Sequence, residues 1–294
     1  MDILKDFIDA NPDKFHQFSD TEMVKMHKIL LEMIDDIFEF CKKRGLTLYA
    51  SGGTALGTIR HKGFIPWDED VDFSMPRKDC NILLSEFVNY FDGKYFIEAP
   101  NSDLVGNHVF IKIKKKNTVM TDLLTKQGCS GFCIDIFPID FASNHKIVRT
   151  IQGWHYMMFR NLLYVVSYAR QYDLFMKKGF KKCKLSTKIV AYSGYAIGKI
   201  LGIVPLEKWV NRFDKIVQHK AVTDYWVIAS GIHSYAVETF DVSVYLPDKF
   251  GEFEGRPMRL PGKVEDIMTR FYGDYMTPPP PDKRAKHFFM EISF

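Results

Sequence analysis

The chain has 294 residues, of which 46% are hydrophobic, 26% are charged and 15% are aromatic. This globular composition excludes a mainly disordered, collagen-like or coiled-coil protein. The net charge of +4 is too small to indicate nucleic-acid binding unless the charge is concentrated in one place. A surplus of aromatic residues, with 25 Phe and 14 Tyr, is typical of a dense core, a membrane-facing surface or a pocket for a flat or cationic ligand.

The first half of the chain alternates between helical and strand patterns. A capping box at 19–22 begins an amphipathic helix, and Gly45 ends it. The elements expected after it are a strand over 46–50, a short helix over 54–60, a strand over 71–75, a helix over 78–91 and strands over 95–98, 108–114, 118–122 and 131–137.

The pattern changes after about residue 142. Few strand signals, many aromatic residues and many lysines predict several helices over 145–220. A loop with a short hairpin is expected over 240–262 and a helix over 263–272. We therefore predict an α+β fold, with a small mixed sheet flanked by helices and a mainly helical C-terminal elaboration.

The cysteines and the N-terminus bear on the compartment. The N-terminal residues are charged and lack the apolar segment of a signal peptide. Five cysteines, an odd number spread along the chain, do not indicate a disulfide framework, so a reducing cytoplasm is expected. Cys129 and Cys133 are favoured as buried thiols over a zinc site. The apolar stretch over 189–205 is too interrupted for a spanning helix.

An acidic cluster, Asp-Glu-Asp-Val-Asp, occupies residues 68–72. Asp70 and Asp72 are two apart in the expected strand, so their side chains point to one face, roughly 6.5–7 Å apart along the chain. Such a pair can share a divalent cation, for which Mg²⁺ is the natural choice and Mn²⁺ the alternative. A solvated acidic turn is the other interpretation. A calcium EF-hand is excluded because Phe73 and Asp79 stand where Gly and Glu are required.

Three neighbouring features favour a site over an acidic turn. Gly52 and Gly53 precede a helix, where backbone N–H groups can approach a phosphate. The triplet Arg60-His61-Lys62 can bind phosphate oxygens, although a surface basic cluster looks the same. Asp135 is a lone acid in an apolar strand and needs a partner or a metal. This order matches the nucleotidyltransferase layout, in which three carboxylates hold metal against the phosphates of a nucleotide.

Asp140 is an alternative third acid. It follows Pro138, so it is expected in a turn.

The stretch over 49–72, YASGGTALGTIRHKGFIPWDEDVD, strongly resembles the signature of the LicD family, the phosphocholine transferases of bacterial surface glycans. Fukutin-type phosphoribitol transferases are related to them. Two later blocks are also similar to the family: FCIDIFPID over 132–140 and RFYGDYM over 270–276. The region between about 145 and 240 is not recognised, and substrate choice is expected to lie there.

The resemblance implies a nucleotidyltransferase-like fold and a CDP-activated alcohol as donor. Phosphocholine from CDP-choline would move to a hydroxyl of a cell-surface glycan or of its lipid-linked precursor, in lipopolysaccharide or teichoic acid biosynthesis, and CMP would leave. Residues 1–142 would form the catalytic core with the N-terminal helix. Residues 143–294 would complete the core and the acceptor side.

The resemblance also implies roles for individual residues. Asp70 and Asp72 would bind Mg²⁺, and Asp135 would complete the metal site or take the proton of the acceptor. The residues expected to contact substrate are Gly52, Gly53 and Thr54 at the donor phosphates, Arg60, His61 and Lys62 in the same motif, and Lys112 and Thr118 in the later strands. An exposed strand lysine is an equally weighted interpretation of Lys112. Trp67 could stack on a base or a choline cation or pack in the core.

An aromatic stretch over 154–170 stands beside a lysine-rich stretch over 177–188. Together they are compatible with peripheral contact at the inner face of an anionic membrane, and equally with a buried helix followed by a solvated loop. A cytoplasmic protein is expected, and no nucleic-acid partner.

Two other functions remain open. One is transfer of another phospho-alcohol, such as ribitol or glycerol, or of a nucleotidyl group to a small acceptor. The other is a non-catalytic nucleotide- or carbohydrate-binding module, which the presence of all three carboxylates disfavours. An aromatic cage beside the metal would favour choline, whereas a polar pocket would favour a polyol.

Overall fold

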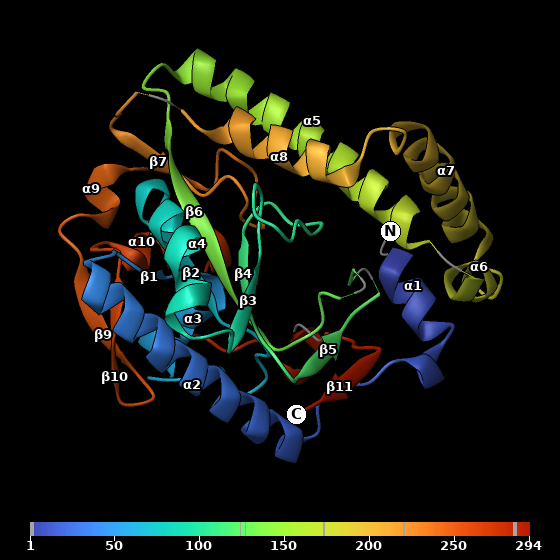
Figure 1. Cartoon of the computed structure of the whole chain (residues 1–294), viewed down its shortest axis with the longest axis horizontal. Coiled ribbons are helices and arrows are strands. Elements are labelled where there is room, and N and C mark those ends of the chain that lie inside the picture. The colour runs from blue at the N-terminus through green and yellow to red at the C-terminus, as the bar shows by residue number, and fades with distance from the viewer. Residues whose placement is uncertain (1–2, 124, 127, 173, 220, 285–286) are drawn as a thin grey trace.

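A mixed β-sheet lies at the centre of the chain, with helices packed around it (Figure 1). The computed structural model describes residues 3–123, 125–126, 128–172, 174–219, 221–284 and 287–294. The α-helices are α1 (Ile3–Asp9), α2 (Asp20–Arg44), α3 (Gly52–Arg60), α4 (Arg77–Tyr90), α5 (Lys146–Gln171), α6 (Leu174–Phe180), α7 (Leu185–Leu201), α8 (Leu206–Val217), α9 (Val242–Tyr245) and α10 (Val264–Tyr272). The strands are β1 (Tyr49–Ala50), β2 (Asp72–Pro76), β3 (Tyr95–Glu98), β4 (Ile111–Lys115), β5 (Val119–Thr121), β6 (Cys133–Ala142), β7 (Tyr225–Val227), β8 (Thr239–Asp241), β9 (Lys249–Phe253), β10 (Arg256–Leu260) and β11 (Glu291–Ser293).

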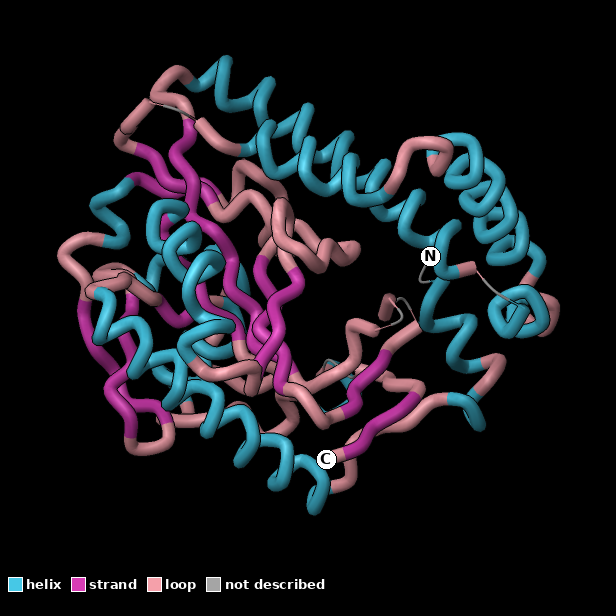
Figure 2. Tube along the Cα trace, in the orientation of Figure 1, coloured by secondary structure: helices cyan, strands magenta, loops and turns pink. Residues whose placement is uncertain are grey.

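The main sheet has the strand order β1-β2-β6-β4-β3. Strand β7 pairs with the C-terminal end of β6, and β8 pairs with β7. Strands β2 and β6 are parallel, whereas the other pairs are antiparallel. Helices α5 and α8 lie side by side, beyond the C-terminal end of β6 (Figure 2). The expected fold class, a mixed sheet flanked by helices, is confirmed.

Helix α2 forms where the capping box predicts it. The side chain of Ser19 accepts a hydrogen bond from the Glu22 N–H, and Glu22 reaches back to the Ser19 N–H. Gly45 ends the helix at φ +67° in the left-handed region. The apolar face of α2 is buried on the sheet, through Met26, Leu30, Met33, Ile34, Ile37, Phe40 and Cys41.

The second half of the chain shares its core with the first half. Val264, Ile267 and Met268 of α10 belong to the same buried cluster as the sheet residues Phe73, Ile134 and Ile136. A second cluster joins α5 and α8, and a small third cluster joins α1, α6 and α7.

The structure corrects several expected boundaries. Strand β1 spans only Tyr49–Ala50, and Asp70 lies in the loop just before β2 instead of in the strand. Strand β6 runs on to Ala142, so the expected turn at Asp140 is wrong. Pro138 is tolerated within β6 because pairing with β4 ends at Ile136 and pairing with β7 starts at Asp140.

The cysteines and the helix lengths complete the description. The five cysteines are free thiols, four of them buried. No single helix in the described parts of the chain is long and apolar enough to cross a bilayer. Helices α7 and α8, bent by 86° at the break between them, reach that length and composition only when they are taken together.

Candidate active site

Asp72 and Asp135 are neighbours on the parallel strands β2 and β6. On the other side of β6, Lys112 of β4 pairs in register with Asp135. The backbone N–H of Asp135 donates to the Val71 carbonyl at 3.0 Å, which continues the pairing into the acidic motif. Three strands therefore present two acids and a lysine side by side on one face of the sheet.

The Gly-Gly turn lies directly against the acids. A Cβ atom on Gly52 would come within 2.9 Å of Asp72 Oδ2, and one on Gly53 within 2.4 Å of Asp68 Oδ2. Gly52 also has φ +48°, which favours glycine. Glycine is therefore required at both positions because the carboxylates of Asp72 and Asp68 lie against the backbone there. The same lack of a side chain would also let a phosphate approach.

Backbone contacts fix the turn to strand β2. The Ser51 N–H donates to the Asp72 carbonyl at 3.0 Å. The Asp72 N–H donates to Thr54 Oγ1 at 2.9 Å. Thr54 is buried, and its hydroxyl binds the backbone of Asp72 instead of facing solvent.

The acids raise one another's pKa values. Burial, followed by the charge of Asp70, raises the pKa of Asp68 to about 8. Burial, with the charges of Asp70 and Asp135, raises the pKa of Asp72 well above its ordinary value. The same arrangement would suit a divalent cation, because a bound cation would remove this repulsion.

No preformed cluster of three or more His, Cys, Asp or Glu ligands is found among the described residues. The assignment of Asp70, Asp72 and Asp135 as metal ligands therefore stays a prediction. Mg²⁺ does not need such a cluster, since it is commonly held by one or two carboxylates together with substrate phosphates and water. The Asp70–Asp72 pair fits that mode of binding.

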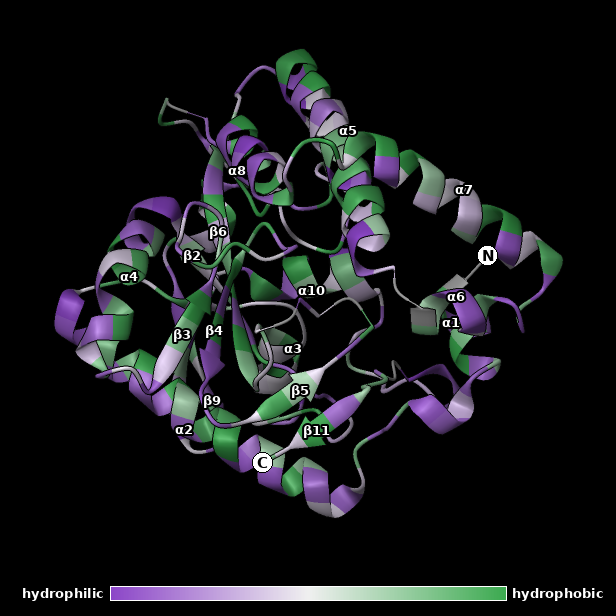
Figure 3. Cartoon of the chain, turned by 45° about the vertical axis from the view of Figure 1, so that its right-hand side comes forward, coloured by the Kyte–Doolittle hydropathy of each residue, from purple (hydrophilic) through white to green (hydrophobic). Residues whose placement is uncertain are grey.

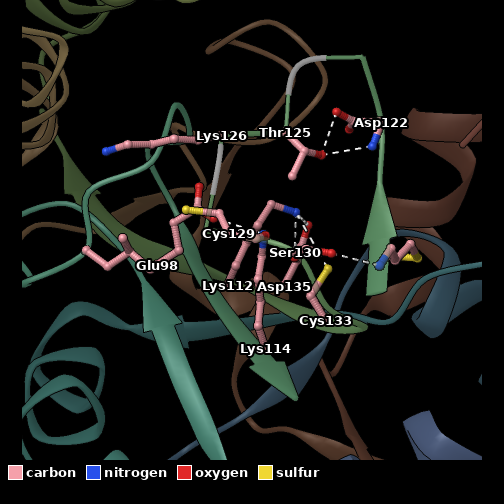
Figure 4. Close-up of polar contacts among 12 residues, drawn as sticks. Glu98, Lys112, Lys114, Asp122, Thr125, Lys126, Cys129, Ser130, Cys133 and Asp135 are labelled. Atoms are coloured by element: carbon pink, nitrogen blue, oxygen red, sulfur yellow. Dashed lines mark hydrogen bonds and ion pairs between the residues drawn. The ribbon is translucent and has the colours of Figure 1, made fainter. Parts of the chain in front are cut away.

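Lys112 binds Asp135 through both carboxylate oxygens, at 2.8 and 2.6 Å (Figure 4). The two side chains are only 12% and 14% exposed. Burial raises the pKa of Asp135, against the opposing charge of Lys112. Burial disfavours the charged form of Lys112, but Asp135 outweighs this and raises the pKa of Lys112. Lys112 is therefore not an exposed strand lysine.

A second buried ion pair lies beside the first. Lys114 Nζ is 2.9 Å from Glu98 Oε2, and it also donates to the Cys129 carbonyl (Figure 4). A cavity of about 80 Å³ opens between these residues and Lys112. Most charged side chains that line this cavity form ion pairs with other residues of the chain.

Two phenylalanines extend the same face of the sheet. Phe110 precedes β4, two residues before Lys112, and Phe137 lies two residues after Asp135 in β6. Their ring centroids are 4.5 Å apart, and both side chains are half-buried. The Lys112 ammonium is 5.0 Å from the Phe110 centroid. A small aromatic surface therefore adjoins the Lys112–Asp135 pair.

Arg60 donates to His61 Nδ1 at 3.3 Å, and the three residues of the basic triplet otherwise have different partners. Arg60 Nη1 donates to the Tyr275 carbonyl at 2.6 Å, which ties the first resembling block to the third. The His61 ring is edge-on to Trp67, and burial, with the charge of Arg60, lowers the pKa of His61. Lys62 is exposed, and its carbonyl accepts from the Glu254 N–H.

The C-terminal segment covers the outside of the acidic motif. The Arg284 guanidinium lies 3.8 Å from the Trp67 ring centroid, and Trp67 also packs on the main core. His287 Nδ1 is 2.9 Å from Glu69 Oε2, and this contact raises the pKa of His287. One face of Trp67 is thus in contact with this chain's own cation.

Two other residues from the sequence analysis lie outside the site. Thr118 Oγ1 donates to the Lys115 carbonyl at 2.8 Å and accepts from the Phe132 N–H at 3.0 Å, which is a structural role. Asp140 is bound by Arg77 at 2.9 and 2.6 Å, and Arg77 also binds Asp214. Asp140 is therefore committed to a structural ion pair.

Sequence reasoning missed several residues of the site. Asp68 was part of the quoted motif, but its contact with Gly53 depends on the fold. Burial and the charges of Asp72, Asp68 and Asp70 raise the pKa of Tyr272, which is 43% exposed. Tyr272 stands in the third resembling block, and that block was the one signal that could have identified it.

Two comparisons of the sequence with known proteins bear on the family. Residues 45–163 match the sequence model described as the LicD/FKTN/FKRP nucleotidyltransferase domain. The chain is 26% identical over 267 residues to the lipopolysaccharide cholinephosphotransferase LicD of Haemophilus influenzae, covering 90% of this chain and 94% of that protein. It is 31% identical over 139 residues to an uncharacterized protein of Rickettsia prowazekii, covering 43% and 49% of the two chains. The resemblance to the LicD family is confirmed.

Proposed function

We propose that this chain, whose residues 45–163 match the LicD-type nucleotidyltransferase domain, transfers phosphocholine from CDP-choline to a hydroxyl of a cell-surface glycan or its lipid-linked precursor. The comparisons indicate a phosphotransferase of the LicD type. The observation that carries the proposal is the alignment of Asp72, Asp135 and Lys112 on three adjacent strands beside the Gly-Gly turn.

Mg²⁺ is the proposed cofactor, with Asp70 and Asp72 as its protein ligands. The mutual repulsion that raises the pKa of Asp72 supports this assignment, because a cation would stabilise the charged carboxylates. The bound ion would neutralise charge on the donor phosphates during transfer. Thr54 accepts a hydrogen bond from the Asp72 N–H and the Gly52 backbone lies against the Asp72 carboxylate, so α3 positions Asp72, whereas Asp70 lies in the loop before β2.

Asp135 is the proposed base for the acceptor hydroxyl. It is next to Asp72 in register, and Lys112 binds both of its oxygens. The lysine orients the carboxylate and favours its charged form, which is the form that accepts a proton. The acceptor oxygen would form a bond to the phosphorus that carries choline while the bond from that phosphorus to the oxygen of CMP breaks, so that CMP leaves.

Choline is favoured over a polyol by the rings beside Asp135. Phe110 and Phe137 offer a half-buried aromatic surface, and aromatic faces attract quaternary ammonium groups. A cation of this chain already lies against both Trp67 and Phe110, Arg284 at 3.8 Å from the first ring centroid and Lys112 at 5.0 Å from the second, so Phe137 is the ring best placed for choline. A polyol would need hydrogen-bond partners at the place where these rings stand.

The direct test measures CMP release by the purified protein with CDP-choline, Mg²⁺ and a lipopolysaccharide acceptor. The variant Asp72→Asn is expected to lose activity roughly a hundredfold or more while its circular dichroism is unchanged. The matched variant Asp248→Asn changes an acid that is paired with Arg259, outside the site, and should stay active. Near-normal transfer by Asp72→Asn would refute the metal assignment.

A thermal-shift screen identifies the donor. CDP-choline, CDP-ribitol and CDP-glycerol are compared in the presence of Mg²⁺. The proposal expects the largest stabilisation from CDP-choline, and a larger effect from either polyol donor would transfer the assignment to that alcohol.

A further inference from the structure

Helix α7 packs with its small residues inward. Thr187 and Ala191 are buried, Gly194 meets Tyr168, and a Cβ atom on Gly198 would come within 2.3 Å of the Val165 carbonyl of α5. These positions recur at helical spacing on one face. The close approach of α7 to α5 therefore depends on small side chains.

The opposite face of α7 carries large apolar side chains into solvent. Ile200 is 69% exposed, and Ile203, just beyond the helix end, is 83% exposed. The other exposed apolar side chains of this face and its flanks are Leu185, Ile189, Val190, Tyr192, Ile197 and Val204. A soluble amphipathic helix has the reverse arrangement, so this face is built for an apolar neighbour.

Helix α5 repeats the feature. Its residues Ile147, Ile151, Trp154 and Met158 recur at helical spacing, and each is about half exposed or more. Trp154, at 77%, is among the most exposed large side chains of the described chain. Tryptophan is enriched where membranes meet water. Figure 3 shows α5 and α7 at the periphery of the molecule, with hydrophobic segments along both.

The charge of this region is opposite to that of the rest of the chain. Residues 145–206 contain eleven Lys and Arg residues and one acid, Asp173, so they carry +10, which leaves −6 for the remainder of a chain of net charge +4. The exposed lysines around α6 and α7 are Lys177, Lys178, Lys181, Lys182, Lys184 and Lys199. Among the described residues none lies within 4.0 Å of their ammonium groups as an ion-pair partner, although the charges of Lys184 and Lys182 lower the pKa values of Asp6 and Asp13.

We propose that the outer face of α5 and α7, with the lysines of the α6–α7 segment, binds an anionic lipid bilayer. The apolar side chains of α7 would enter the headgroup region, and the lysines would contact lipid phosphates. Exposed isoleucines without charge would suit a second copy of the chain equally well. The six exposed lysines decide against that occupant, because two copies facing each other would bring like charges together.

Vesicle co-sedimentation tests the proposal without donor or acceptor, so its outcome is independent of the transferase assignment. The full chain should bind phosphatidylcholine vesicles containing phosphatidylglycerol at low salt, bind pure phosphatidylcholine vesicles weakly, and be released as salt is raised. No binding to the anionic vesicles at low salt would overturn it.

Matched variants locate the surface. Changing both Lys181→Gln and Lys182→Gln should weaken binding by about fivefold for each lysine, and Ile200→Gln with Ile203→Gln by roughly tenfold. Two controls lie on α2. One is Val24→Gln, at another exposed apolar position, and the other is the double variant Lys28→Gln with Lys42→Gln; both should bind vesicles as the unchanged protein does.

Two results would contradict the assignment of this face. One is an equal loss of binding in the α2 controls. The other is a dimer in light scattering without lipid that Ile200→Gln with Ile203→Gln converts to a monomer, because the face would then be a self-association surface.

Discussion

Gly52 and Asp72 are in contact in a way that leaves no room for a side chain. A Cβ atom on Gly52 would lie 2.9 Å from Asp72 Oδ2, and the backbone at Gly52 has φ +48°. The turn that opens α3 and the acid that begins β2 therefore form one unit.

The variant Gly52→Ala tests this unit. We expect it to lose about 1–2 kcal/mol of folding free energy from the positive φ and, in addition, to lose transferase activity because Asp72 is displaced. The control Gly45→Ala has the same type of strain at φ +67° but meets no atom within 4 Å. It should be destabilised by a similar amount and remain active. Urea unfolding and initial rates give the two readouts, and equal rates for both variants would contradict the contact.

Lys112 offers a test of the buried ion pair. Lys112→Met leaves the Asp135 carboxylate buried without its partner, which costs about 3–5 kcal/mol for a buried pair, and activity should fall with the loss of orientation of Asp135. Lys115→Met on the same strand breaks the more exposed pair with Glu32 and should cost less than about 1 kcal/mol. Urea unfolding compares the two variants. Similar free energies for both would show that the Lys112–Asp135 contact is no stronger than a surface pair.

The aromatic surface predicts donor selectivity. Phe110→Leu and Phe137→Leu should each raise KM for CDP-choline about fivefold, because a leucine lacks the ring quadrupole that attracts a quaternary ammonium. Their KM for CDP-glycerol should change little. Phe96→Leu, a half-buried phenylalanine on β3, is the matched control. An equal effect of Phe110→Leu on both donors would assign the ring to packing instead.

Glu238 gives the chain a pH-dependent stability. Burial raises its pKa from 4.5 to about 7, and the side chain is only 3% exposed. An acid whose pKa is raised on folding keeps its proton better in the folded state. The contribution of Glu238 to the free energy of unfolding is therefore fully present below pH 4.5, and it is lost as pH rises through about 7.

The variant Glu238→Gln removes this titration and preserves an oxygen that can accept from the His233 N–H, as the glutamate does at 3.1 Å. We expect the unchanged protein to lose stability relative to Glu238→Gln as pH rises from 5 to 8. The difference between their Tm values should therefore grow in favour of the variant by several degrees, the equivalent of roughly 2–3 kcal/mol. Differential scanning calorimetry across that range measures it. A difference independent of pH would contradict the raised pKa.

Local sequence was sufficient for much of the fold and for part of the site. The capping box and Gly45 set the ends of α2, because capping depends on residues within one turn of the helix. The Gly-Gly turn and the acidic motif were likewise predicted, because both lie within residues 49–72. The expected membrane contact of 154–188 is now a proposal for α5–α7, and the division at residue 142 remains a prediction, although both halves share one core.

The sequence determined which chemical groups the protein carries: paired carboxylates, a glycine turn, a lone acid and an uneven distribution of lysines. The tertiary structure alone decided how they combine. Lys112 meets Asp135 across 23 residues, Arg60 meets Tyr275 across 215, and Asp140 is taken by Arg77. Such contacts depend on strand order and register. These follow from the packing of the whole core, so no local pattern contains them.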